Sequence, residues 1–170
     1  MQPLFKYNGF ISGQCYQMKY NPKNRDILEF YDRAPLFIFV SYLPQLKLMQ
    51  GLNLHFLTPA QRKIIVKFLS RNSGSLNNKT PLTFDWWSVV RKMIPAAILS
   101  WRRYLPNRMK SVEHIPFKNW DEDVIKSQTA KLVGLGPEEL QQIMAYRINR
   151  YAGRPQTYRN KVKAKDRRKG

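Results

Sequence analysis

Cysteine, acidic residues and long apolar runs are all scarce in this sequence. Cys15 is the only cysteine among 170 residues, which excludes an internal disulfide and a zinc-ribbon site and favours a reducing compartment. No apolar run approaches the ~20 residues that span a bilayer, and the first ten residues, MQPLFKYNGF, lack the pattern of a secretory signal. We therefore expect neither a disulfide-rich secreted protein nor a membrane protein.

Residues suited to catalysis are also few. The two histidines, His55 and His114, stand far apart and in no spacing typical of a metal site, and no local signature pairs either of them with Cys15 as a nucleophile. The glycine-rich loop that binds ATP phosphates is missing, which excludes ATP-driven work by this chain. The composition favours a binding protein over an enzyme, and it predicts no cofactor, metal or small-molecule ligand.

A basic DNA-binding protein could be a metal-dependent nuclease. Such enzymes hold Mg²⁺ with two or three converging carboxylates. The candidates form two groups: Asp26, Glu29 and Asp32, and the consecutive Asp121, Glu122 and Asp123. The second group is better explained by the preference of acids for a helix amino terminus, and Asp32 with Arg33 also fits a turn with a local salt bridge. Nuclease activity stays an alternative that depends on the first group.

The charge of the chain is strongly one-sided. Thirty lysines and arginines against 11 acidic residues give a net charge of +19. Self-repulsion of this size destabilises a compact state, so a polyanionic partner is the simplest reason for it. DNA and RNA are the candidates, and an anionic membrane is the least favoured.

The positive charge is densest at the carboxyl end. Residues 159–170 contain almost nothing apolar except Val162 and Ala164, too little to offset the entropy cost of ordering, so this arm is expected to be disordered in isolation. We expect it to lie along DNA phosphates or in an acidic groove of a protein. The basic residues of this region are Arg147, Arg150, Arg154, Arg159, Lys161, Lys163, Lys165, Arg167, Arg168 and Lys169.

The first third of the chain has strand patterns. Residues 10–20 predict a strand with a turn, and residues 35–42 (PLFIFVSY) predict the central strand because they are continuously apolar and rich in β-formers. Residues 47–57 alternate and predict a further strand, with Leu52, Leu54 and Phe56 on one face. Residues 108–115 predict a later strand. A small antiparallel sheet or open barrel follows from this spacing.

Helical patterns begin at Thr58, which we expect to cap a helix that starts at Pro59. Its expected apolar face consists of Ile64, Ile65, Phe68 and Leu69. Its basic stripe, at intervals of four residues, consists of Lys63, Lys67 and Arg71.

Further short helices are expected after this one. Thr83 is expected to cap a helix through Met93, and Pro95 to start another that continues through Leu105. This second helix would carry Arg102 and Arg103 as phosphate contacts, with Trp101 at least partly buried beside them. Residues 117–127 predict an amphipathic helix, and residues 138–151 a last one with its arginines at the end.

These patterns together predict an α+β protein. Residues 1–152 are expected to form one domain, rich in strands over residues 1–57 and mainly helical over residues 58–152, and residues 153–170 form a basic tail. The predicted nucleic-acid contacts are the stripe on the first helix, Arg102, Arg103 and the carboxyl-terminal basic residues.

Three blocks of sequence resemble a known family. The first is YNPKNRDILEFYDRAPLFIF (residues 20–39), the second GLNLHFLTPAQRKII (residues 51–65) and the third WRRYLPNRMKSVEHIPFKNWDEDV (residues 101–124). In order and rough spacing they resemble the DNA end-protector, or head-completion, proteins of T-even-type tailed phages.

The resemblance implies a non-catalytic protein of the virion, assembled in the host cytoplasm. It would sit at the portal vertex of the filled head, bind the end of the packaged duplex genome, shield that end from host exonuclease and make the head competent for tail joining. The chain differs from longer members of the family in having no large amino-terminal extension and in carrying the basic tail.

Two other functions fit part of the sequence. A neck, tail or baseplate subunit could use the same basic surface and tail to dock on acidic neighbouring virion proteins such as the portal. An RNA-binding protein of the ribosomal kind would explain the charge and the tail but not the three blocks.

Deleting residues 154–170 tests the role of the basic arm. Each phosphate contact that is lost should reduce the slope of log affinity against log salt by about 0.9, so the truncated protein should bind duplex DNA more weakly and with a shallower salt dependence. Titration of one duplex at two salt concentrations measures both quantities. Equal affinity of the full and truncated chains would exclude the arm as a DNA contact.

Overall fold

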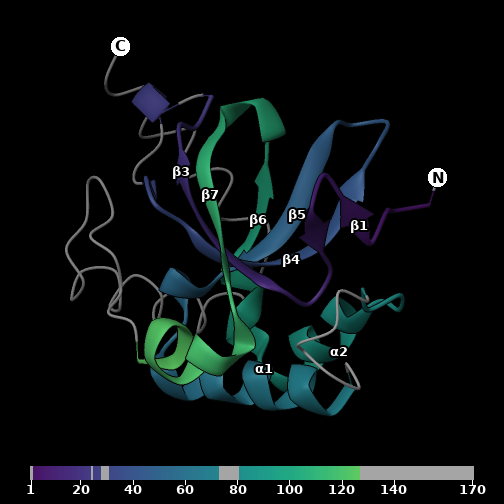
Figure 1. Ribbon diagram of the computed structural model, residues 1–170, viewed down its shortest axis with the longest axis vertical. Helices are drawn as coiled ribbons and strands as arrows, with labels where there is room; N and C mark the ends of the chain where they lie inside the picture. The colour runs from purple at the N-terminus through teal and green to yellow at the C-terminus, as the bar shows by residue number, and fades with distance from the viewer. Residues whose placement is uncertain (1, 24, 28–30, 73–80, 127–170) are drawn as a thin grey trace, which may run out of the picture.

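The centre of the fold is an antiparallel sheet with the strand order β6–β5–β4–β3–β7 (Figure 1). The computed structural model describes residues 2–23, 25–27, 31–72 and 81–126. The five strands, in chain order, are β3 Cys15–Tyr20, β4 Leu36–Leu43, β5 Leu48–Asn53, β6 Trp101–Tyr104 and β7 Met109–Ile115. Neighbouring strands pair antiparallel throughout. The predicted α+β class is confirmed, and residues 101–115 supply the two outer strands.

Short helices and a hairpin complete the described part. The hairpin consists of β1 Lys6–Tyr7 and β2 Phe10–Ile11, and the α-helices are α1 Pro59–Asn72 and α2 Trp86–Met93. Single helical turns occur at η1 Arg25–Ile27, η2 Leu54–Phe56, η3 Pro95–Leu99, η4 Pro106–Arg108, η5 Phe117–Asn119 and η6 Asp121–Ile125. The predicted helix over residues 138–151 and the basic arm lie outside the described residues.

Strand β4 is the middle strand of the sheet and is buried on both faces. Because side chains alternate along a strand, Leu36, Ile38 and Val40 join one apolar cluster, and Phe37 and Phe39 join another. None of these five side chains is more than 5% exposed. The continuous apolar run therefore marks a strand covered on both faces, as the sequence predicted.

The helices cover the first of these two faces. Ile65 and Leu69 of α1 and Trp86 of α2 are fully buried in this cluster together with strand residues. Figure 1 shows α1, α2 and the turns of residues 117–125 on the same side of the sheet. The indole of Trp86 donates a hydrogen bond of 2.9 Å to the hydroxyl of Ser12, which ties α2 to the turn before β3.

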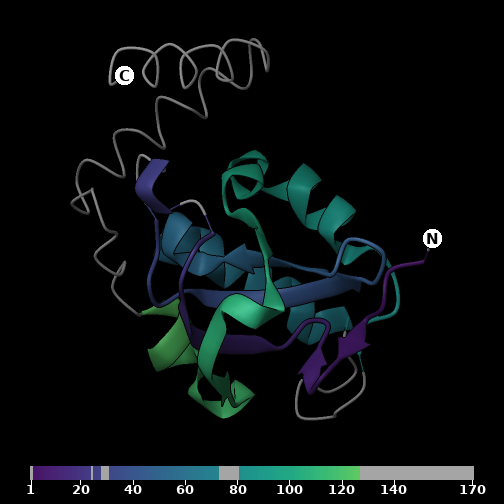
Figure 2. The ribbon, with the colours of Figure 1, turned by 90° about the horizontal axis from the view of Figure 1, so that it is seen from above.

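The second face is aromatic and is covered in part by the hairpin. Phe10 of β2 packs edge-on against Tyr16 of β3, with ring centroids 4.8 Å apart. The Tyr16 hydroxyl accepts a hydrogen bond of 2.8 Å from the amide of Ile11. Tyr7 stacks on Tyr42 at 3.6 Å. Figure 2 shows the hairpin, near the amino terminus, on the other side of the sheet from α2.

Two predicted elements are wrong in part. The strand expected to reach residue 57 ends at Asn53, because the Asn53 side chain accepts a hydrogen bond from the amide of His55 and starts a 3₁₀ turn. The helix expected from Pro95 ends after Leu99, and Trp101–Tyr104 is a strand that pairs with β5. Pairing with β5 satisfies the backbone hydrogen-bonding groups of this segment. Local sequence patterns do not reveal that such a partner strand is present.

Helix details are partly confirmed. Thr58 caps α1 through a reciprocal pair of hydrogen bonds with Gln61, the capping-box arrangement. Asp85, and not Thr83, caps α2. Ile64, predicted to be in the core, is 47% exposed.

Arg62 takes a place in the core that the apolar pattern did not predict. Its side chain is fully buried, and burial lowers the pKa of its guanidinium. Its Nε donates a hydrogen bond of 2.8 Å to the carbonyl of Leu54 and its Nη1 one of 3.1 Å to the carbonyl of Val124. Arg62 therefore joins α1 to the turn after β5 and to the turns after β7.

Replacing Arg62 by alanine should lower the free energy of unfolding by about 3 kcal/mol, because two buried carbonyls lose their donors and packing is lost. Lys63→Ala is the matched control: it removes one cation from the next position of the same helix, where the side chain is exposed, and should change stability by less than about 0.5 kcal/mol. Urea unfolding measures both. Equal losses for the two variants would contradict the structural role of Arg62.

Candidate nucleic-acid interface

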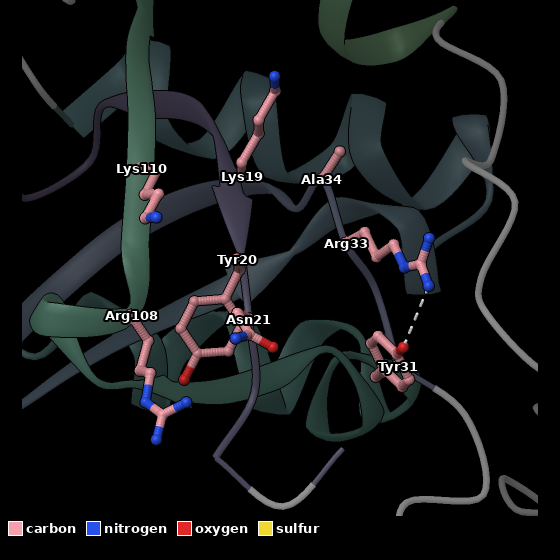
Figure 3. A pocket seen from close by; sticks show the side chains of 8 residues that line it. All are labelled: Lys19, Tyr20, Asn21, Tyr31, Arg33, Ala34, Arg108 and Lys110. Carbon is pink, nitrogen blue, oxygen red and sulfur yellow. Dashed lines mark hydrogen bonds between the residues drawn. The ribbon is translucent and has the colours of Figure 1, made fainter. Parts of the chain in front are cut away.

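An open pocket of about 470 Å³ lies where β3 ends and β7 begins. Figure 3 shows its lining at close range. The lining residues are Lys19, Tyr20, Asn21, Tyr31, Arg33, Ala34, Arg108 and Lys110. They come from three segments that are distant in the sequence: the end of β3, the loop before β4 and the start of β7.

Backbone pairing brings these segments together. In the β3–β7 ladder Lys19 is opposite Lys110 and Tyr20 is opposite Met109, beyond a register shift between Gln17 and Lys19. The amide of Tyr20 donates a hydrogen bond of 2.9 Å to the carbonyl of Arg33, and the amide of Asn21 one of 3.2 Å to the carbonyl of Arg108. The backbone of the pocket is therefore fixed by the sheet and its extensions.

The lining is strongly positive. It contains four cations, Lys19, Arg33, Arg108 and Lys110, and no carboxylate. Like charges placed directly opposite each other on two strands destabilise the pair, which is the situation of Lys19 and Lys110. A bound anion would remove this repulsion, so the pocket is suited to a negatively charged group.

Tyr20 is an aromatic member of the lining that is held in place by contacts of its ring and its hydroxyl. The ring of Tyr20 packs edge-on against Tyr104 at 5.1 Å, and its hydroxyl accepts a hydrogen bond of 3.2 Å from the amide of Leu105. Burial raises the pKa of Tyr20 above its ordinary value, so its hydroxyl stays protonated at neutral pH and adds no negative charge. The guanidinium carbon of Arg33 lies 5.9 Å from the ring centroid of Tyr31.

A buried carboxylate fixes one wall of the pocket. Asp32 lies between Tyr31 and Arg33 in the chain and is 7% exposed. One of its oxygens accepts a hydrogen bond of 3.0 Å from the amide of Ala34. The other accepts one of 2.9 Å from the side chain of Asn53 and lies 2.5 Å from Nδ1 of the buried His55. Asp32 thus turns inward and leaves its two neighbours to line the pocket.

This arrangement corrects one interpretation of Asp32. The alternatives considered from the sequence were a metal ligand and a turn with a salt bridge to Arg33. The turn is present, but the side chain that contacts the carboxylate is His55 and not Arg33. Within the described ranges, no three His, Cys, Asp or Glu side chains are close enough to hold a metal ion.

The predicted DNA contacts on the folded part do not meet in the pocket. Lys63, Lys67 and Arg71 are exposed on α1, as their spacing predicted. Arg102 and Arg103 are consecutive in β6, so they point to opposite faces of the sheet. Arg102 packs over the ring of Phe56 at 4.1 Å, whereas Arg103 is exposed. The predicted contacts from Arg147 to Lys169 lie outside the described residues.

The four cations of the pocket were missed by the sequence analysis. Their only local signal is a cation close to an aromatic or polar residue, as in KYN (residues 19–21) and NRMK (residues 107–110). Such strings are common in a chain with 30 basic residues. Only the pairing of β3 with β7 shows that these two strings form one site.

The fold and the pocket together define a class: a small α+β protein with a cationic pocket at the ends of two paired strands. The particular family follows from sequence comparison. A family model described as phage T4 terminal DNA protecting protein matches residues 6–134, which is most of the chain, and the protein belongs to this family. The family predicted from the three blocks is thereby confirmed. Comparison with curated proteins and with solved structures finds no match.

The match bears on function in two further ways. By its description, the family is one of phage proteins that protect DNA termini. The match ends before the basic arm, whereas it includes every residue of the pocket.

None of the helices in the described ranges has the length and the hydrophobicity that a membrane-spanning helix needs.

Asp32→Asn tests whether the buried carboxylate holds the pocket wall. Weakening the buried hydrogen bonds that this carboxylate makes with Ala34, Asn53 and His55 should lower the free energy of unfolding by about 1–3 kcal/mol, and amide hydrogen exchange at Ala34 should become faster. Asp121→Asn, at an exposed carboxylate, is the control and should change stability by less than about 0.5 kcal/mol. Unchanged exchange at Ala34 in the Asp32 variant would contradict the role of Asp32.

Proposed function

We propose that this protein binds the termini of packaged phage DNA and shields them from exonucleases. The observation that carries the proposal is the pocket of four cations without a carboxylate, in a chain that belongs to a family of terminal DNA protecting proteins. The protein acts by occupying the DNA end and carries out no reaction itself.

Binding is proposed to be independent of base sequence. The cations of the pocket lie at strand ends and in a loop, and the exposed stripe of Lys63, Lys67 and Arg71 follows the single helix α1. Lysine and arginine on such surfaces neutralise phosphates, which position a protein on DNA but carry no sequence information. Affinity should therefore depend steeply on salt and little on the sequence of the duplex.

The particle context is proposed from the resemblance of the three sequence blocks. The protein would sit at the portal and neck of the virion, complete the filled head and enable tail joining, after assembly in the host cytoplasm. Its partners would then be the genome end and the neighbouring portal or neck proteins. A position at the distal end of the tail would instead make it a structural subunit that docks on acidic neighbours.

An exonuclease assay on linear duplex DNA tests the protective function. At saturating protein and low salt, an end-dependent exonuclease should degrade the duplex several-fold more slowly, and equally so for two unrelated sequences. The double variant Arg33→Gln/Arg108→Gln should lose most of this protection because two of the four pocket cations are gone. Lys47→Gln/Lys118→Gln removes the same charge from exposed positions outside the pocket and should protect nearly as well as the unmodified protein.

The assay has a clear negative outcome. If the duplex is degraded at the same rate with and without saturating protein, the protective function is excluded. If both double variants lose protection equally, the effect comes from total charge and the pocket is not the interface.

A further inference from the structure

We infer that the basic pocket is an end-recognition site that holds the terminal phosphomonoester of a DNA strand. The inference rests on the proposed function and goes further, because it states which chemical group at a DNA end the protein recognises. The group is the phosphate at a strand terminus, as opposed to the phosphodiesters along the duplex.

The size of the pocket argues for a terminal group. A volume of about 470 Å³ falls in the range of roughly 300–1,000 Å³ that is typical of small-ligand sites. A single nucleotide fits a cavity of this size. A strand end can place its terminal nucleotide in the pocket, whereas the side of a duplex can contact the exposed cations Lys19, Arg33 and Lys110.

The charge of the pocket argues for a phosphomonoester. Four cations from three segments line it, and among the described residues no carboxylate forms an ion pair with any of them. A terminal phosphate has a second ionisation with a pKa near 6 and carries about −1.5 to −2 at neutral pH, as phosphate monoesters do, whereas a phosphodiester carries a single negative charge. The more highly charged group gains more from the same cations.

The kinds of cation present suit the same group. Arg33 and Arg108 carry planar guanidinium groups that bind two phosphate oxygens at once, and Lys19 and Lys110 act as point charges. A phosphomonoester offers three terminal oxygens, whereas a phosphodiester offers two. Figure 3 shows Arg33 and Arg108 on opposite sides of Tyr20.

The tyrosines of the lining fit the rest of the terminal nucleotide. The rings of Tyr20 and Tyr31 line the same pocket, and both are partly exposed. Aromatic rings stack on bases regardless of sequence. The pocket thus combines a site for the phosphate with apolar surface for the sugar or base that carries it, as a sequence-independent end receptor requires.

Binding to four DNA probes of the same length and sequence tests the inference. One duplex has 5′-phosphates, one has 3′-phosphates and one has hydroxyl groups at both termini; the fourth is closed by loops and has no ends. We expect at least one phosphorylated duplex to bind about tenfold more tightly than the hydroxyl duplex. The closed molecule should bind most weakly.

Two double variants assign the effect to the pocket. Arg108→Gln/Lys110→Gln should reduce the preference for phosphorylated ends to less than about twofold. Lys63→Gln/Lys67→Gln removes the same charge from α1 and should weaken binding to all four probes while leaving the preference intact. Thermal unfolding of both variants checks that each is folded, and if the first is not, Lys110→Gln alone takes its place, since Lys110 is exposed.

The outcomes separate this inference from the proposed function. Equal binding of phosphorylated and hydroxyl ends, both tighter than the closed molecule, overturns the inference and leaves end binding intact. A preference that survives in the Arg108/Lys110 variant places the phosphate elsewhere and also overturns it. Absence of binding to any probe at low salt rejects the proposed function itself.

Discussion

The position of the candidate site depends on one buried carboxylate, Asp32, and its contact with the imidazole of His55. Asp32 and His55 are both nearly inaccessible to solvent, and burying charges is costly unless each has partners. The amide of Ala34 and the side chain of Asn53 supply the remaining hydrogen bonds to Asp32. These partners hold the side chain of Asp32 facing inward. Its neighbours Tyr31 and Arg33 are thereby placed at the pocket.

A second constraint is the burial of β4 on both faces. The helices cover one face and the aromatic residues with the hairpin the other, so charged residues lie at the ends and edges of the sheet and on the outer surface of the helices, as Lys63 and Lys67 do on α1. The buried Arg62 of α1 donates hydrogen bonds to the carbonyls of Leu54, which precedes the helix in the chain, and of Val124, which follows it. It thereby connects the helix to both segments. The basic side chains that surround the core therefore do not interrupt it, and the fold can carry a large positive charge on its surface.

Much of the fold could be predicted from local patterns, and less of the site. The run at residues 35–42 predicted a central strand because such continuous apolar sequence is stable only when covered on both faces. The segment Trp101–Tyr104 was predicted as helix, because nothing local shows that β5 has a free edge to pair with it. That error also affected the predicted DNA contacts. As consecutive residues of a strand, Arg102 and Arg103 point to opposite faces of the sheet and do not form one contact. Lys63, Lys67 and Arg71 were placed correctly on the surface of α1 because helical spacing alone decides which residues share a face.

By itself the sequence determined the α+β class, the strongly positive net charge and the family, since these follow from composition, periodicity and ordered motifs. Only the tertiary structure decided which of the 30 basic residues meet in one pocket. The physical reason is the register of the sheet: β3 pairs with a strand far along the chain and sets Lys19 opposite Lys110. Shifting a register by one residue would turn every side chain to the other face, and that register is fixed by packing of the whole core.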